Sequence, residues 1–310
     1  MKAVQVLFPV FFMLFLGYIS RKKQWVTYEQ NEGAKNLVLN VLFPFLVYNV
    51  LVSSKITSNF VIHIVYVDTC WILIYIITNH LTRFTGKRYA HISSFLLMTS
   101  EGGNVALPLY LTLVTANNAI NTVTFDVGGI LINFGLVPAL ITKKTAGHVK
   151  PSILFKKIIT SSFMIAVILG LIANLTSFHR LVMSSQLGPI YTNTIQMVTG
   201  PIMGIILFTI GYELKFEIKM LKPLFRLAIV RLIGCSLIIA GFFLFFPQLM
   251  QNEAFKIGVL LYFMCPTGFP VPLQVQPLVK NRDDETFMSA FISLFIIIAL
   301  IVYTIIVITK

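Results

Sequence analysis

Residues 101–108 read EGGNVALP and place two glycines, an asparagine and a proline inside an apolar run over 92–114. A second apolar run, over 255–278, is interrupted in a similar way by PTGFP at 266–270. Proline removes a backbone donor and breaks a helix. Unwound backbone at membrane depth is tolerated only where it lines a cavity or is buried in protein. These two interruptions decide the fold that the sequence predicts.

The chain around these interruptions has the composition of a membrane protein. It has 310 residues, of which 57% are hydrophobic and only 11% are charged, and its mean hydropathy is +0.86. Soluble domains have about 45–50% apolar and about 25% charged residues, so a soluble enzyme, a disordered chain and a nucleic-acid-binding domain are excluded. Cys70, Cys235 and Cys265 lie in apolar runs, so we expect neither a disulfide framework nor a metal site.

Apolar windows along the chain predict an all-α polytopic membrane protein with ten transmembrane helices. A membrane-spanning helix needs about 20 apolar residues. The windows lie near 3–20, 36–53, 60–80, 92–114, 120–141, 157–174, 190–211, 223–246, 255–278 and 287–309.

Basic residues orient these predicted spans. The loops that follow odd-numbered spans hold 18 of the 24 Lys and Arg residues, with Lys35 counted in the first of them, whereas the termini and the other loops hold five. Cytoplasmic loops carry the excess of Lys and Arg. We therefore expect a multi-pass protein of the cell membrane with both termini extracytoplasmic. The net charge of +13 then reflects orientation in the lipid bilayer, and no nucleic-acid partner is expected.

The interruptions recur at matching places in two halves of the chain. Pro44 and Pro201 lie 157 residues apart, and Pro108 and Pro270 lie 162 residues apart. An odd number of spans in each half forces the two halves into opposite orientations, so the repeat is inverted. The predicted organisation is a first five-helix repeat over 1–141, a cytoplasmic linker over 142–157 and a second, inverted five-helix repeat over 158–310.

Paired Gly and Pro interruptions in two halves are the best sequence pointer to a transporter binding site. The ends of half-helices at such breaks present N–H groups and partial positive charge, which bind anions. The alternative is that these prolines only kink ordinary spanning helices. We expect a substrate site where the broken helices of spans 4 and 9 cross. Its predicted residues are Asn40, Gly103, Asn104, Pro108, Pro266, Thr267, Gly268 and Pro270.

A few charged residues lie within the apolar windows, where an acid at the bilayer centre costs about 2.5–3.5 kcal/mol. Glu101 and Asp68 are candidates to carry a coupling proton or sodium ion. Alternatively, each carboxylate hydrogen-bonds to unwound backbone and only holds the break in shape. Arg231 could form an ion pair with Asp68 or Glu101, meet an anionic substrate, or extend its head to the nearby cytoplasmic surface. Asp126 lies near the end of its span and is interpreted as interfacial.

Enzyme motifs do not accompany these residues. The sequence contains no H-E-x-x-H, G-x-S-x-G or P-loop pattern. Nothing in it assembles a nucleophile, a base and an orienting group. We therefore expect no catalytic residue, no cofactor and no enzymatic activity.

Three motifs resemble the auxin efflux carrier family: NVLFP at 40–44, GNVALPL at 103–109 and PTGFP at 266–270. The short loops are similar to the bacterial branch, which includes malate and malonate permeases. The resemblance implies a scaffold of spans 1, 2, 6 and 7, a mobile transport unit of spans 3–5 and 8–10, elevator-type movement and a homodimer through the scaffold. The family usually has a glycine before the proline of the first break, where this chain has Leu107.

The resemblance also implies roles for two residues. Related plant carriers place an asparagine of the first break and an acid of the third span near the substrate carboxylate, and Asn104 and Asp68 match these positions. We expect a secondary transporter of a small organic anion such as malate, with a coupling proton. A sodium-coupled bile-acid-type symporter shares the architecture and is an alternative. An alternative of another class is a membrane receptor that binds a ligand without transporting it.

Overall fold

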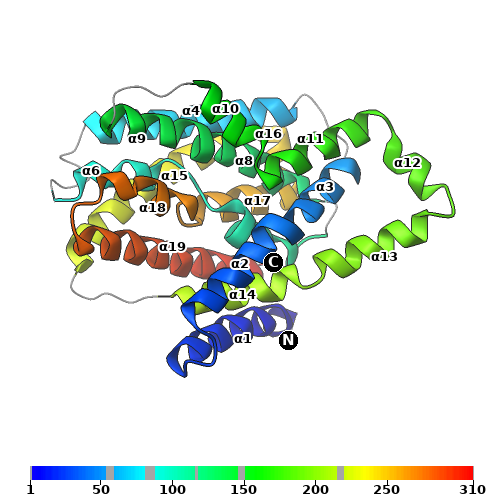
Figure 1. Cartoon of the computed structure of the whole chain (residues 1–310), viewed down its shortest axis with the longest axis horizontal. Helices are drawn as coiled ribbons and strands as arrows, with labels where there is room; N and C mark the ends of the chain where they lie inside the picture. The colour runs from blue at the N-terminus through cyan, green and yellow to red at the C-terminus, as the bar shows by residue number, and fades with distance from the viewer. Residues whose placement is uncertain are drawn as a thin grey trace.

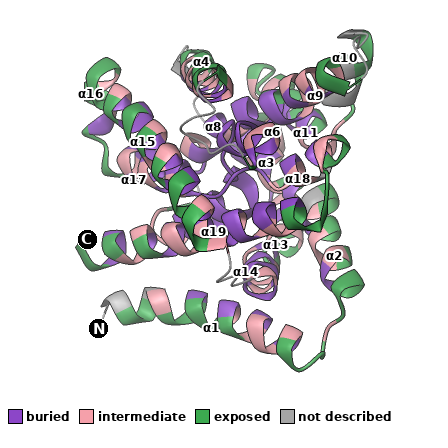
Figure 2. Cartoon of the chain, turned by 90° about the vertical axis from the view of Figure 1, so that its left-hand side faces the viewer, coloured by how far each residue is buried: buried purple, intermediate pink, exposed green. Residues whose placement is uncertain are grey.

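The computed structural model describes residues 2–53, 59–80, 88–115, 118–145, 151–214 and 220–309. In these residues the chain is almost entirely helical, and no strand occurs among them. Buried residues gather in the middle of the molecule, and many residues of peripheral helices such as α1, α4 and α15 are exposed (Figure 2). The predicted all-α class is confirmed for this part of the chain.

The first half of the chain contains the first interruption and runs from the N-terminus to α9 (Figure 1). Its elements are α1 (Lys2–Lys22), α2 (Tyr28–Leu37), a π-helical turn (Val38–Leu42), α3 (Phe43–Ser53), α4 (Asn59–His80), α6 (Ala90–Ser93), a 3-10 turn (Phe95–Leu97), a second π-helical turn (Gly102–Ala106), α7 (Leu107–Leu111), α8 (Ile120–Ile130), a third π-helical turn (Leu131–Leu136) and α9 (Val137–Thr145).

The second half contains the other interruption and ends in the longest helix of the described chain. Its elements are α10 (Pro151–Ile159), α11 (Ser162–Leu175), α12 (Phe178–Met183), α13 (Gly188–Thr199), α14 (Ile202–Glu213), α15 (Leu221–Phe245), α16 (Pro247–Met250), α17 (Glu253–Met264), α18 (Pro270–Val275), a 3-10 turn (Gln276–Leu278) and α19 (Arg282–Thr309).

Some of these helices are long and apolar enough to cross a membrane. The sequence predicts ten spans. The described chain contains six such helical stretches, which are Tyr28–Ser53, Phe60–His80, Ile120–Thr145, Gly188–Glu213, Leu221–Phe245 and Arg282–Thr309. Two of the other predicted spans are split by non-helical backbone at residues 99–101, here called the first break, and at residues 265–268, here called the second break. The count of ten spans and the inverted repeat stay predictions.

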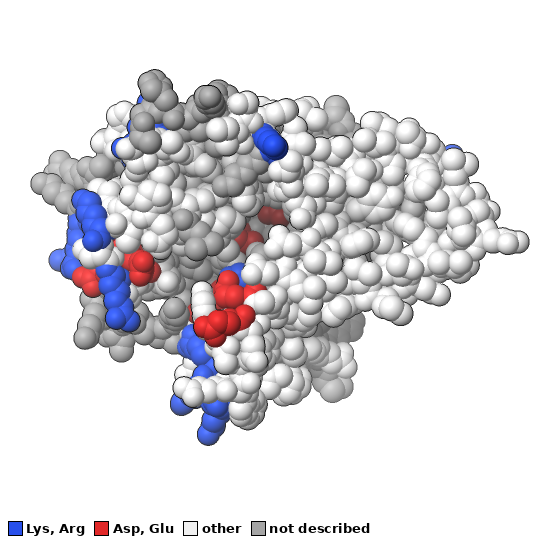
Figure 3. Space-filling model, viewed as in Figure 1, with Lys and Arg blue, Asp and Glu red and all other residues white. Residues whose placement is uncertain are grey.

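The exposed apolar side chains of the outer helices are consistent with contact with lipid. On α4, Val61, Val65, Leu73 and Ile77 are each at least half exposed. Large exposed apolar patches mark interaction or membrane surfaces. The face of the molecule in Figure 3 is mostly uncharged, and acidic side chains lie at and inside a hollow near its centre.

Prolines widen helices in this fold as well as breaking them. Each π-helical turn ends shortly before a proline: Pro44, Pro108 or Pro138. A proline ring clashes with the carbonyl four residues earlier, and a π-turn carries its hydrogen bonds one residue further back. The N–H of Phe43, for example, donates to the carbonyl of Val38. Pro44 therefore does not interrupt its span, and the helical stretch continues to Ser53.

Helix α2 begins earlier than the predicted span at 36. Thr27 and Gln30 form a capping box, in which Thr27 Oγ1 accepts the Gln30 N–H at 3.3 Å and Gln30 Oε1 accepts the Thr27 N–H at 2.9 Å. Such a box satisfies two N–H groups at a helix start. Lys35, which the charge count placed in a loop, therefore lies on a helix. Of the predicted linker 142–157, residues 146–150 lie outside the described residues, and the flanking parts belong to α9 and α10.

Helices α1 and α14 pack with their backbones in contact (Figures 1 and 2). A Cβ atom on Gly17 would overlap the carbonyl oxygen of Phe208, and one on Gly211 would overlap the carbonyl oxygen of Leu14. Small residues permit this approach between membrane helices. In addition, α3 packs on α11 and α13, and α14 packs on α2. The segments of the expected scaffold thus contact one another, while their role as a scaffold stays a prediction.

Candidate functional site

The first break and the second break lie side by side. The N–H of Glu101 donates to the carbonyl of Pro266 at 2.8 Å. The N–H of Gly268 donates to Thr99 Oγ1 at 3.0 Å, and the hydroxyls of Thr99 and Thr267 lie 3.4 Å apart. Backbone groups that lose their helical partners at each break are therefore partly satisfied by the other break. We call this place the crossing.

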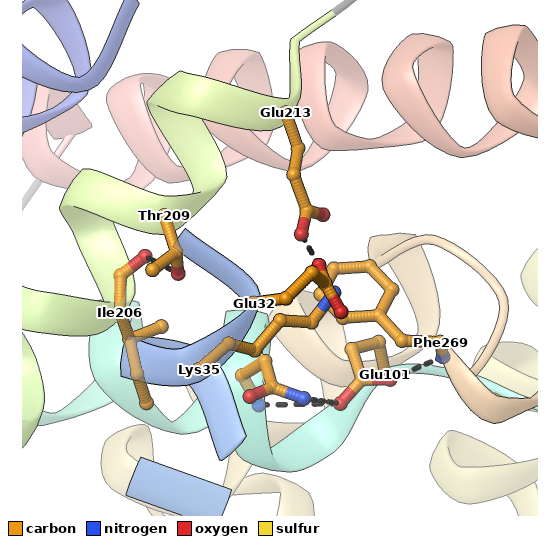
Figure 4. A network of polar contacts seen from close by, with 8 residues as sticks. Glu32, Lys35, Glu101, Ile206, Thr209, Glu213 and Phe269 are labelled. Carbon is orange, nitrogen blue, oxygen red and sulfur yellow. Dashed lines mark hydrogen bonds and ion pairs between the residues drawn. The ribbon is translucent and has the colours of Figure 1, made fainter. Parts of the chain in front are cut away.

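A single carboxylate, that of Glu101, accepts hydrogen bonds from the N-terminal ends of both helical segments that follow the breaks, here called the outgoing helices (Figure 4). Its Oε1 accepts the side-chain amide of Asn104 at 2.6 Å and the Asn104 N–H at 3.3 Å, and its Oε2 accepts the Phe269 N–H at 2.6 Å. Glu101 is only 7% exposed. N–H groups at helix starts have no intrahelical partner and favour negative charge. Of the residues expected to hold a substrate carboxylate, Asn104 donates to Glu101, whereas the N–H of Gly268 donates to Thr99.

Arg231, on α15, hydrogen-bonds to the C-terminal ends of the helical segments that lead into the two breaks, here called the incoming segments. Its guanidinium donates to the carbonyls of Leu96 at 3.0 Å, Thr99 at 2.8 Å and Cys265 at 3.0 Å. These carbonyls come from the ends of the incoming helical segments, where acceptors lack intrahelical partners and cations are favoured. Among the described residues Arg231 forms no ion pair, so unpaired carbonyls take the place of the expected acidic partner. At 1% exposure it also does not extend to the surface.

Asp126 lies behind the first break rather than at an interface. A Cβ atom on Gly102 would overlap its carboxylate, and one on Gly103 would lie 3.2 Å from Oδ2. The interfacial interpretation was wrong, because α8 packs against the π-helical turn of the first break and brings its first turns inside the protein. Gly102 and Gly103 leave room for this carboxylate. Asp126 is thus a residue of the site that sequence reasoning missed.

Asp68 lies one helix further from the crossing. Its carboxylate on α4 contacts Gly128 of α8, where an added Cβ would lie 2.5 Å from Oδ1. The Oδ1 atom is buried and has no hydrogen-bond partner in the described part of the chain. Asp68 of α4 therefore contacts α8, the helix that carries Asp126. A buried carboxylate with an unsatisfied oxygen is costly, which makes Asp68 a candidate for function rather than for stability.

Lys35 and Glu213 form an ion pair beside the crossing, which sequence reasoning also missed. Lys35 Nζ lies 2.6 Å from Glu213 Oε1 and 3.4 Å from Glu32 Oε1, and it sits 4.9 Å from the ring centroid of Phe269 (Figure 4). These side chains line a cavity of about 330 Å³ between α2, α14, α18 and α19. Because Phe269 also donates its N–H to Glu101, this cavity reaches the crossing.

A second cavity, of about 200 Å³, borders the crossing at another point. Its lining includes Gly103 and Pro108 of the first interrupted segment, Phe43 of α3 and Met203 of α14. Both cavities therefore lie between helices of the expected scaffold and helices of the expected transport unit.

The structure brings most of the predicted site residues together. Gly103, Asn104, Pro266, Thr267 and Gly268 lie at the crossing, Pro108 lines the second cavity, and Pro270 begins α18. Gly268 has room for no side chain, since a Cβ there would lie 2.6 Å from Asn133 Nδ2. Asn40 is exposed on the first π-helical turn and lines neither cavity. Its expected position facing the site is therefore not what the structure has.

Comparison with known proteins identifies a relationship for part of the chain. Residues 2–132 match the family described as membrane transport protein, which is the auxin efflux carrier family that the motifs resemble. The match contains the first break and Asp126, and no curated protein matches the chain. It indicates a multi-pass membrane transporter, in agreement with the apolar helices, and it is consistent with a chain that is not an enzyme.

Proposed function

We propose that the protein is a secondary active transporter that moves a small organic anion, such as malate or a similar carboxylate, across the cell membrane by alternating access. One observation carries this proposal: donors from the starts of two helices converge on a single carboxylate, that of Glu101. Helix N-termini are ready-made anion sites. A crossing that holds an internal carboxylate offers the same donors to the carboxylate of a substrate.

In this mechanism the substrate replaces Glu101 at these donors. Hydrogen bonds to an ionised group are roughly twice as strong as neutral ones, so protonation of Glu101 weakens its hold on Asn104 and Phe269. The released N–H and amide groups then bind the substrate carboxylate. One proton and one anion consequently occupy the crossing together, which couples transport to the proton gradient. Asp126 of α8 and Asp68 of α4 provide further carboxylates for the proton.

Access to the crossing alternates between the two cavities. The larger one is lined by Lys35, which is paired with Glu213, and by Phe269, whose N–H reaches Glu101. The smaller one reaches Gly103 and Pro108. Elevator-type movement of the transport unit against the scaffold opens one cavity while it closes the other. With both termini extracytoplasmic, the cavity that contains Lys35 faces the cytoplasm, and the homodimer forms through the scaffold.

Uptake into proteoliposomes tests this proposal. Purified protein is reconstituted, and labelled malate, other carboxylates and a bile acid are supplied with an imposed proton gradient, an imposed sodium gradient or neither. We expect carboxylate uptake that an inward proton gradient accelerates, with liposomes lacking the protein as the blank. Glu29→Gln, an exposed acid outside the site, is the control for a lost charge. Absence of uptake for every compound contradicts the transport function.

A further inference from the structure

Three backbone carbonyls from both interrupted segments meet one buried cation. Leu96 precedes the first break, Thr99 opens it, and Cys265 opens the second break; the carbonyls of all three accept hydrogen bonds from the guanidinium of Arg231 over 2.8–3.0 Å. In transporters with broken helices, unwound carbonyls and half-helix C-terminal ends coordinate the coupling cation. In this protein the comparable carbonyls are occupied by a side chain of the protein itself.

We propose that Arg231 is a built-in cation at the crossing, which takes the carbonyl site that a coupling sodium ion would otherwise need, so that transport does not depend on sodium. This inference rests on the proposed function, because it concerns the ion that accompanies the substrate. Arg231 is a positioning residue: it fixes the incoming ends of both breaks, while Glu101 holds the outgoing ends.

The chemistry of arginine suits this role better than that of lysine. Its planar guanidinium carries five N–H donors and stays charged in proteins, so one group can serve carbonyls from two separate segments. The rings of Trp71 and Phe295 lie with their centroids 5.6 Å and 5.0 Å from the guanidinium carbon. Aromatic faces attract a cation, most strongly where water is excluded. A lysine ammonium is a compact point charge and cannot reach all three carbonyls at once.

Trp71 makes the site observable without transport. The chain has two tryptophans; Trp25 is 64% exposed, whereas Trp71 is fully buried beside Arg231. In a Trp25→Phe background, the emission of Trp71 therefore reports on the guanidinium. The experiment compares this background protein with Arg231→Ala, Arg231→Lys and the control Arg226→Ala, whose exposed arginine lies on the same helix.

We expect uptake by the wild type to be equal in sodium and choline media. Hydrogen bonds to a charged group are among the stronger ones, so Arg231→Ala should reduce uptake about tenfold or more and change the emission of Trp71. Low millimolar guanidinium should bind the vacated carbonyls, restore the emission and raise the thermal stability of Arg231→Ala. The control Arg226→Ala should show none of these responses.

Several outcomes would overturn the inference. Sodium-dependent uptake by the wild type contradicts it, as does an Arg231→Ala protein whose uptake and Trp71 emission equal those of the background. An altered emission that guanidinium does not restore also contradicts it. If Arg231→Ala fails to fold, Arg231→Lys is the deciding variant. Unchanged uptake and unchanged Trp71 emission in Arg231→Lys would show that no guanidinium is needed. If the protein transports no carboxylate, the proposed function fails, while the guanidinium and emission measurements still decide the role of Arg231.

Discussion

Glu101 and Phe269 are 168 positions apart in the chain, yet the carboxylate of Glu101 accepts the Phe269 N–H at 2.6 Å. Through this bond the residue that caps the first interrupted segment also caps the second. Arg231 likewise donates hydrogen bonds to carbonyls of both segments that lead into the breaks. One internal anion and one internal cation therefore hold both breaks, and each of them is a single substitutable side chain.

Replacing Glu101 by Gln should separate substrate binding from proton coupling. The amide keeps the shape of the side chain but has no charge to hold the donors of Asn104 and Phe269. Uptake driven by a proton gradient should fall, whereas exchange of labelled for unlabelled carboxylate should persist and lose its pH dependence. The measurement is uptake and exchange in proteoliposomes between pH 5.5 and 8, with Glu29→Gln as control. An unchanged pH profile in Glu101→Gln would rule out Glu101 as the coupling group.

Adding a methyl group at Gly268 should disturb the crossing. The new Cβ would lie 2.6 Å from Asn133 Nδ2 and 3.0 Å from Thr99 Oγ1, and overpacking of a filled interior costs about 1–3 kcal/mol. We expect Gly268→Ala to lower the unfolding temperature in detergent and to impair uptake. Gly33→Ala is the matched control, because a Cβ there meets nothing within 4 Å. Equal behaviour of the two variants would contradict the tight packing described here.

The contact between α1 and α14 should not tolerate an added methyl group at Gly211 of α14, but should tolerate one at Gly204 of the same helix. A Cβ on Gly211 would overlap the carbonyl oxygen of Leu14, whereas a Cβ on Gly204 approaches only Met13 Cε, at 3.9 Å. Gly211→Ala should therefore broaden the size-exclusion peak and lower thermal stability, since backbone cannot move aside as a flexible side chain can. Gly204→Ala should resemble the wild type, and loss of stability there instead would argue against this packing.

The ion pair of Lys35 and Glu213 should contribute more than an exposed one. Their side chains are 17% and 22% exposed, compared with 69% and 54% for Arg88 and Asp283. A double-mutant cycle with Lys35→Met and Glu213→Gln should give a coupling energy of about 1 kcal/mol or more. The cycle with Arg88→Met and Asp283→Asn should give about 0–1 kcal/mol, as is typical of surface pairs. A larger coupling energy for Arg88 and Asp283 than for Lys35 and Glu213 would contradict the contact described for the buried pair.

The breaks could be predicted from sequence because their causes are local. Glycine and proline act on their own backbone, so EGGNVALP and PTGFP indicate where helices stop without any knowledge of neighbours. The start of α2 was also readable, since Thr27 and Gln30 have the spacing of a capping box. That signal would have placed Lys35 on a helix. The widened turns before Pro44 and Pro138 are a further local effect, although a proline alone does not distinguish a π-turn from a break.

The partners of the charged residues could not be predicted, because they depend on tertiary packing. For Arg231 the sequence left an ion pair, a substrate contact and a surface position open, but backbone carbonyls such as those that it binds belong to residues of every type and leave no mark in the sequence. Lys35 and Glu213 are 178 positions apart, and no spacing relates them. Asp126 was assigned to an interface from the limits of an apolar window. Its place behind Gly102 and Gly103 follows from the packing of α8 on the first break.

Proton uptake on ligand binding tests the central claim most directly, namely that a substrate carboxylate replaces Glu101 at the donors of the crossing. Purified protein in weakly buffered detergent solution is titrated with the transported carboxylate while the pH is recorded. The wild type should take up about one proton for each carboxylate bound, because Glu101 leaves its donors in the protonated form. Glu101→Gln should bind the carboxylate with no proton uptake. Carboxylate binding by the wild type without proton uptake, or equal uptake by Glu101→Gln, would contradict the claim.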